Sequence, residues 1–220
     1  MGIGRRRFIA LSGLALAGLT IDPLKAVATN NNAYVNKKLG IMFDKPSHWG
    51  YVHVKDFGKL KDEQILGNGM EEHKEAVYEE QEDPICLITK YHEDLPEYEG
   101  LFSPTITVHV THLSELELVL YGGFEGLMET TKLRAAELLT DFKVVKKYKP
   151  YIVEGSEFYE YDAIYLFEHV ELTEPLPVEL KVIKARQGNL FYDFNCHQSK
   201  ARDQVADTEF QKFKESIKLI

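Results

Sequence analysis

The chain has 220 residues and a formal net charge of −9 at pH 7, because 35 acidic residues outnumber 26 basic ones. Its 12 Tyr and 12 Phe supply apolar material for a core, which argues against disorder. This length suits one domain. An acidic surface repels phosphate groups, so the charge argues against nucleic acids and anionic membrane surfaces as partners.

Residues 1–28 have the three parts of an export signal in the usual order. A basic region at 5–7 precedes an uncharged stretch over 8–21, and Ala26 and Ala28 form a small-x-small cleavage site. The apolar stretch is shorter than the roughly 20 residues that a membrane-spanning helix needs. We therefore expect a cleaved signal peptide and no transmembrane segment after cleavage, with an uncleaved anchor as the alternative. Cleavage would leave a net charge of −12.

The residues of the basic region also follow the order found in one specific type of export signal. Arg5 and Arg6, followed by Phe8 and Ile9, resemble the twin-arginine signal, which a receptor reads. A general secretory signal with an additional arginine is the alternative. The twin-arginine route predicts a bacterial protein that folds before transport and works in the periplasm or elsewhere outside the cytoplasm.

The segments after the signal differ in their patterning. Residues 29–37 are polar and predict a flexible N-terminal arm, ahead of one folded domain over 38–220. Alternating apolar residues over 38–54, interrupted by a proline, predict two short strands around a turn. Residues 55–83 are weakly patterned and charged, and in 71–84 the acidic residues cluster without apolar periodicity, which predicts a solvated loop or edge segment.

Two segments have helical spacing. Ser114 and Glu117 have the spacing of a capping box at the start of a helix that continues to about residue 139. Three glycines weaken this helix and mark either a close packing face or a break: Gly122, Gly123 and Gly126. The second helix covers 201–217.

The remaining apolar runs predict strands. They occupy 85–91, 105–111, 142–153, 158–170, 178–185 and 189–197. The last four are joined by short separators rich in glycine and proline, which favour antiparallel hairpins. The sequence therefore predicts the α+β class, an antiparallel sheet covered by helices.

One predicted strand has an aromatic face. Four side chains alternate onto it: Tyr159, Tyr161, Tyr165 and Phe167. We expect this face to pack under a helix. The alternative is a partly exposed aromatic platform for a protein or ligand.

The order of elements resembles the PsbP-like family, which includes the extrinsic PsbP subunit of photosystem II and DcrB-type bacterial lipoproteins. Four residues look like the family's opening hairpin, G-x-x-F-x-x-P-x-x-W: Gly40, Phe43, Pro46 and Trp49. The helix after strand 105–111, Gly155 before the aromatic strand and the ending 213–217 of the last helix also match. The resemblance implies a PsbP-like α/β/α sandwich and a binding or accessory role. The matched residues look structural, so no functional residue is carried over.

Cysteine and histidine offer few candidate sites. Cys86 and Cys196 could form one disulfide outside the cytoplasm or stay as small buried thiols, and the sequence leaves both open. His109 and His112 would point to opposite faces of a continuous strand. The four histidines His92, His109, His112 and His197 could meet in the fold, but nothing in the sequence requires it, so we expect no metal site.

Searches for catalytic motifs lead to no assignment. No serine lies in a G-x-S-x-G turn. Cys196 and His197 are neighbours on a strand and would point apart, and 67–69 lacks the rest of a phosphate-binding loop. We therefore expect no catalytic residue, cofactor or metal.

Together these observations predict an exported, non-enzymatic binding or accessory protein of the bacterial envelope. Its partner would be another extracytoplasmic protein or an envelope component. The alternative is an exported enzyme or small-ligand carrier whose site assembles only in the fold. An exposed apolar patch would favour the first prediction, and a deep pocket with converging polar groups the second.

Overall fold

The computed structural model describes residues 27–30, 32–52, 61–80, 84–91, 102–170, 172–200 and 204–220. The chain forms two compact units, of which the first combines both ends of the sequence: Met1–His48 with Gln204–Ile220, and Trp49–Asp203. The folded domain expected over 38–220 includes residues of both units. The division arises because the last helix packs with the N-terminal strands.

The first unit is a small antiparallel sheet with one helix. Its strands, in spatial order, are β1 (Val27–Asn30), β2 (Ala33–Asn36), β3 (Ile41–Asp44) and β13 (Lys218–Leu219). Helix α6 (Gln204–Ser216), expected over 201–217, packs on β3. The ring of Phe43 stacks on Tyr34 with centroids 4.6 Å apart and meets the ring of Phe213 from α6 at 5.2 Å. These aromatic contacts form the centre of the unit.

The segment 29–37, expected as a flexible arm, contributes to this sheet. Strand β2 pairs with β1 on one side and with β3 on the other. Tyr34 and Val35 are each 4% exposed, and the buried amide of Asn36 donates a hydrogen bond to the Tyr34 hydroxyl at 3.3 Å. The strand has four residues, too few for its three adjacent apolar side chains to produce a recognisable period.

The second unit is built on a large antiparallel sheet. Its strands, in spatial order, are β4 (Gly50–Tyr51), β6 (Cys86–Thr89), β7 (Thr105–His112), β12 (Leu190–Ser199), β11 (Leu176–Gln187), β10 (Ser156–His169) and β5 (Gln64–Ile65). Two further strands, β8 (Thr140–Lys147) and β9 (Tyr151–Val153), pair with β10. The predicted antiparallel meander and the α+β class are confirmed.

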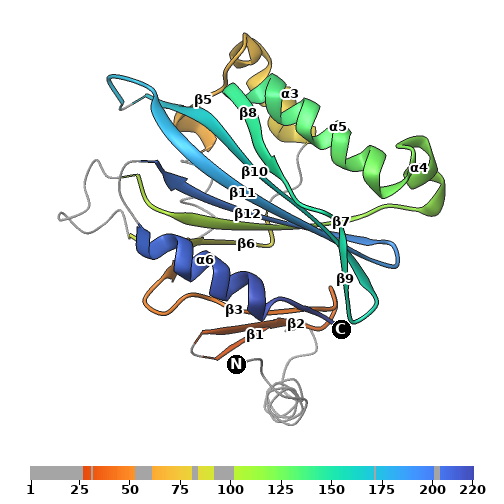
Figure 1. Cartoon of the computed structure of the whole chain (residues 1–220). Helices are drawn as coiled ribbons and strands as arrows, with labels where there is room; N and C mark the ends of the chain where they lie inside the picture. The colour runs from red at the N-terminus through yellow and green to blue at the C-terminus, as the bar shows by residue number, and fades with distance from the viewer. Residues whose placement is uncertain are drawn as a thin grey trace. The chain divides into compact units, whose positions relative to one another are not determined.

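The helices of this unit follow the sheet strands β5 and β7 in the chain. They are η1 (Met70–His73), α3 (Lys74–Glu80), α4 (Glu115–Leu120) and α5 (Gly123–Leu138). Figure 1 shows α4 and α5 following one another along one side of the large sheet. Among the described residues, no helix has the length and apolar content needed to cross a membrane.

Two local predictions from the sequence are wrong. Residues 70–80 are helical and not a loop; most of their described side chains are exposed and Val77 is buried, so no apolar period is visible. Strands β3 and β4 do not form a hairpin, because β3 pairs with β2 and β13 while β4 pairs with β6. Pro46 and Trp49 are nevertheless buried, in the connection between these two strands.

Two of the four rings on the aromatic face of β10, those of Tyr159 and Tyr161, pack under helix α5, as predicted. Phe124 of α5 meets the ring of Tyr159 edge-on, with centroids 4.7 Å apart. The ammonium of Lys132, also on α5, lies 5.3 Å from the ring centroid of Tyr161. Tyr161 and Tyr165 form a core cluster with side chains of β11, including Val182. This sheet face, under α5, is the one that carries the candidate site.

Candidate functional site

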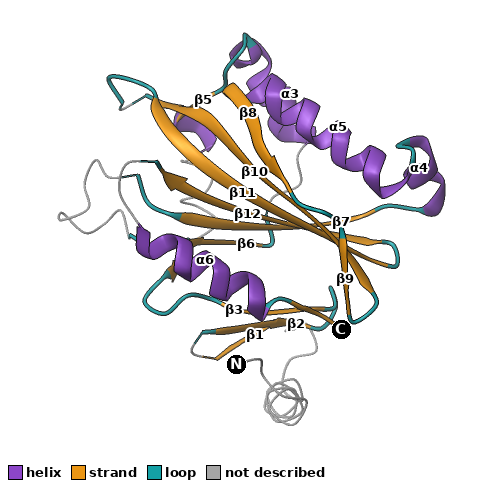
Figure 2. Cartoon of the chain, viewed as in Figure 1, coloured by secondary structure: helices purple, strands orange, loops and turns teal. Residues whose placement is uncertain are grey.

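The helical segment predicted from Ser114 is broken into two helices. The Ser114 hydroxyl accepts a hydrogen bond from the Glu117 amide at 3.3 Å, and the Glu117 carboxylate accepts one from the Ser114 amide at 2.7 Å, which completes the predicted capping box. The Ser114 hydroxyl also donates to the Glu117 carboxylate at 2.6 Å, and this bond, together with the one from the Ser114 amide, lowers the pKa of the Glu117 carboxyl. Gly122 and Gly123 then adopt φ of 79° and 84°, a left-handed backbone that side chains rarely allow. Figure 2 shows the resulting break between α4 and α5, which we name the elbow.

Gly126 allows the chain to pack closely at the elbow. A Cβ atom at this position would overlap the carbonyl oxygen of Tyr121, the last residue before the break. The glycines therefore serve both purposes considered from the sequence, a break at 122–123 and a close packing contact at Gly126.

Helix α4 exposes three apolar side chains on one face. Leu116, Val119 and Leu120 are 71%, 70% and 79% exposed, and their spacing places them together on the helix surface. We name them the α4 stripe. Leu118 is 4% exposed and anchors the helix in a core cluster with Phe124. The stripe therefore lies on the side of α4 that folding does not use.

Acidic side chains flank the α4 stripe on its own helix. Glu115 and Glu117 lie on α4 itself, and Glu125 follows in the first turn of α5. Glu115 accepts a hydrogen bond from Arg186 at 2.8 Å, and its side chain remains 70% exposed. The apolar surface thus has a mostly negative border.

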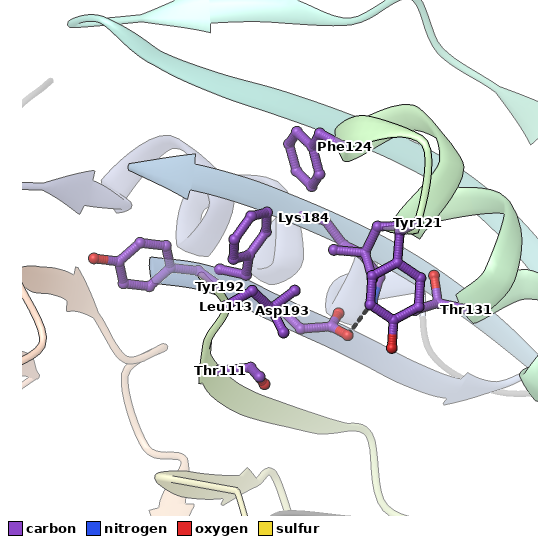
Figure 3. Close-up of a pocket in the computed structure, with 10 residues that line it drawn as sticks. Thr111, Leu113, Tyr121, Phe124, Thr131, Lys184, Tyr192 and Asp193 are labelled. Atoms are coloured by element: carbon purple, nitrogen blue, oxygen red, sulfur yellow. Dashed lines mark hydrogen bonds and ion pairs between the residues drawn. The ribbon is translucent and has the colours of Figure 1, made fainter. Parts of the chain in front are cut away.

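A cavity of about 180 Å³ lies beneath the elbow, between α5 and the sheet. Its wall is mainly apolar and includes Phe124, Leu127 and Phe191. The Phe124 and Phe191 rings meet edge-on with centroids 5.5 Å apart. Tyr121 and Thr131 add hydroxyl groups from the helical side, as Figure 3 shows.

An ion pair lies at the sheet side of the cavity. Lys184 of β11 and Asp193 of β12 are directly opposite in the strand register, and the Lys184 ammonium donates to Asp193 Oδ2. Figure 3 shows the two side chains pointing toward one another. They are 11% and 27% exposed. Asp193 Oδ1 is buried and has no hydrogen-bond partner among the described residues.

A partly buried histidine lies on the same sheet face. His197 Nδ1 is 3.0 Å from the hydroxyl of Tyr165. Burial lowers the pKa of His197 to about 4, with a further contribution from His109 that Asp193 opposes. The imidazole is therefore neutral at pH 7 and acts as a hydrogen-bonding group of the core.

The two cysteines are free thiols and not the disulfide considered from the sequence. Cys86 pairs with Val108 and Cys196 with Ile106, on opposite sides of β7. Two strand spacings of about 4.8 Å place their Cα atoms farther apart than the roughly 7 Å that a disulfide allows. Burial raises the pKa of each thiol to about 12, which makes both unreactive.

The histidines considered as metal ligands are not brought together. His109 and His112 both lie within the continuous strand β7, and three residues of separation place them on opposite faces. His92 lies outside the described residues. Within the described part of the chain, no three His, Cys, Asp or Glu side chains cluster as metal ligands.

Most of the predicted export signal lies outside the described residues, including Arg5, Arg6, Phe8 and Ala26. Strand β1 begins at Val27, so the predicted cleavage after Ala28 would remove the first two of its four residues. Because β1 is at the edge of its sheet, the other strand pairings would remain.

Sequence reasoning did not find Lys184 and Asp193. A signal was present, because the two residues Gly188 and Asn189 join β11 to β12. A two-residue hairpin loop fixes the strand register and places Lys184 opposite Asp193.

Comparison with known proteins identifies the fold. No family model matches the sequence, and no curated protein sequence matches it. The solution structure of cyanobacterial PsbP (CyanoP) from Synechocystis is similar with a TM-score of 0.52 and 12% identity, over 90% of this chain and 99% of that one. The protein has a PsbP-like fold. This similarity concerns the fold alone, since so low an identity carries no functional residue.

Two other solved structures are less similar to this chain, with lower TM-scores. The protein of unknown function PA94 from Pseudomonas aeruginosa has a TM-score of 0.46 and 11% identity, over 62% of this chain and 83% of that one. A protein from Bacteroides thetaiotaomicron has a TM-score of 0.39 and 9% identity, over 82% of this chain and 45% of that one.

Proposed function

We propose that this PsbP-like protein is an exported, non-enzymatic binding protein of the bacterial envelope that contacts another extracytoplasmic protein through the α4 stripe. The observation that carries the proposal is the exposure of Leu116, Val119 and Leu120, each 70% or more. A contiguous exposed apolar patch with a polar border is typical of protein interaction sites. The resemblance to the PsbP-like family also implies a binding or accessory role.

The border of the stripe defines the chemistry of the partner. Glu115 and Glu117 lie beside it on α4, and the whole chain has a net charge of −9. Charges across protein interfaces are arranged to be complementary. The partner surface would therefore be apolar at its centre with lysine or arginine residues around it.

Export rests on the sequence of the first 28 residues. Replacing Arg5 and Arg6 with lysine should retain the precursor in the cytoplasm, because the twin-arginine receptor reads the arginine pair. The measurement is cell fractionation with detection of the precursor and mature forms. Continued export of the variant would contradict the twin-arginine assignment, and an uncleaved precursor in the cytoplasm of wild-type cells would contradict export itself.

Site-specific photo-crosslinking tests the α4 stripe. A photoreactive amino acid at Leu120 should give an adduct of one defined mass with an envelope protein. The same probe at Ile152, which is 75% exposed in the same unit, provides a matched control. The adduct should weaken in the Leu116→Ser variant and in high salt, because both the apolar contact and the charge complementarity would be reduced.

Either of two results would contradict the partner proposal. Equal labelling from positions 120 and 152 would mean that the stripe has no specific partner. A defined adduct that does not change in Leu116→Ser would mean that the apolar face does not make the contact.

The second candidate function is an exported enzyme or small-ligand carrier. The ion pair in the elbow cavity favours it, since polar groups there face an apolar wall. The cavity is nevertheless smaller than the roughly 300–1,000 Å³ of typical ligand pockets, so we place this candidate second.

A further inference from the structure

The size of the elbow cavity restricts what it can hold. Its volume is about 180 Å³, and an apolar cavity of about 150 Å³ is enough to hold benzene. The apolar wall comes from both layers, with Phe124 and Leu127 on α5 and Phe191 on β12. A ligand here has a compact apolar part of only a few carbon atoms.

Within the described part of the chain, the ion pair leaves hydrogen-bonding capacity unused on both of its members. Lys184 donates one N–H to Asp193 Oδ2 there, and an ammonium has three such donors. On the acidic side, Asp193 Oδ1 is buried without a partner among the described residues. A buried carboxylate oxygen without a hydrogen bond is costly and uncommon in proteins. A cationic donor and an anionic acceptor therefore stand next to each other at the cavity.

We propose that the elbow cavity binds a free α-amino acid with a short aliphatic side chain, of the size of valine or leucine. Its carboxylate accepts hydrogen bonds from Lys184, its ammonium donates to Asp193 Oδ1, and its side chain packs against Leu127 and the two phenylalanine rings. The hydroxyls of Thr131 and Tyr121 lie at the same cavity and complete its polar lining.

Ligands with a single charge satisfy only half of this site. A carboxylate without an amine would place a negative charge beside Asp193 and leave Oδ1 without a donor. An amine without a carboxylate would place a positive charge beside Lys184. A zwitterion meets both requirements and brings no net charge into a partly buried site. This inference concerns the cavity and does not depend on a protein partner at the α4 stripe.

Calorimetric titration of the purified protein tests the charge requirement. The ligands are L-valine and L-leucine, with leucinamide as the cation-only analogue and 4-methylpentanoate as the anion-only analogue. We expect saturable binding of at least one amino acid, with each analogue weaker by tenfold or more. Binding of neither amino acid, or equal binding of leucine and an analogue, would overturn the proposal.

Two substitutions locate the binding site. Leu127→Phe should fill the cavity and weaken amino-acid binding by tenfold or more, while Leu133→Phe on the same helix, where the side chain is 67% exposed, should leave it unchanged. Asp193→Asn keeps the size of the side chain and removes the charge that holds the ammonium, so binding should weaken to a similar extent. Circular dichroism confirms that each variant is folded. Unchanged binding in folded Leu127→Phe, or equal losses in both phenylalanine variants, would place the ligand elsewhere.

Discussion

The second unit contains two apolar regions, of which one is buried and the other is exposed. The cluster on β10 and β11 includes Tyr161, Tyr165 and Leu180, each 5% exposed or less. The α4 stripe, in the same unit, leaves its three side chains 70% exposed or more. Burial of one large apolar side chain stabilises a fold by about 1.5–3 kcal/mol, and only the first region supplies that energy. The comparison separates side chains that hold the fold from side chains that remain available to a partner.

The largest expected effect comes from the buried cluster. Leu180→Ala should lower the free energy of unfolding by about 2–5 kcal/mol, because it leaves a cavity in a packed core. The measurement is equilibrium unfolding in urea. The exposed Leu116→Ala provides the matched control and should change stability by less than about 0.5 kcal/mol. Equal losses in the two variants would remove the distinction between the regions.

The buried cluster should also respond to acid. Tyr165 belongs to it and contacts His197, whose pKa is about 4 in the folded protein, against an ordinary value of 6.5. Above pH 6.5 the imidazole is neutral in both the folded and unfolded states and has no effect. As pH falls from 6.5 toward 4, the unfolded state takes up the proton first, so stability falls by about 1 kcal/mol per pH unit.

A substitution isolates this effect from other titrating groups. The His197→Asn variant lacks the imidazole, and its stability should fall less steeply than that of the wild type between pH 6.5 and 4. Urea unfolding at several pH values gives both slopes. Parallel slopes would mean that His197 takes up a proton in the folded protein as readily as in the unfolded chain.

Gly126, which packs closely against the Tyr121 carbonyl at the elbow, should be sensitive to substitution. Gly126→Ala would normally favour a helix, but here the new Cβ overlaps the Tyr121 carbonyl. We expect a loss of about 1–3 kcal/mol in the free energy of unfolding, as for other overpacked sites. The reverse change at an exposed position of α5, Ala136→Gly, calibrates helix propensity alone. Stabilisation by Gly126→Ala would show that the elbow opens without cost.

The sequence alone predicts the structure correctly where interactions between near neighbours in the chain determine it. Ser114 and Glu117 cap α4 as their spacing predicts, and part of the aromatic face of β10 lies under α5. The sequence alone does not predict the structure where strand pairing between segments far apart in the chain determines it. Asn36 lies in a strand that forms only because β1 and β3 flank it. The pocket between α5 and the sheet depends on tertiary packing, although the hairpin turn already places Lys184 opposite Asp193.

The smallest expected effect on stability is also the one that separates binding from folding most sharply. Leu120→Ser removes an exposed apolar side chain from the α4 stripe, so unfolding in urea should change by less than about 0.5 kcal/mol. The photo-crosslinked adduct formed from position 119 should nevertheless be lost. Leu118→Ala, two residues away and buried, should instead cost about 2–5 kcal/mol. If Leu120→Ser destabilised the protein as much as Leu118→Ala, the stripe would belong to the core, and its exposure would no longer indicate a partner.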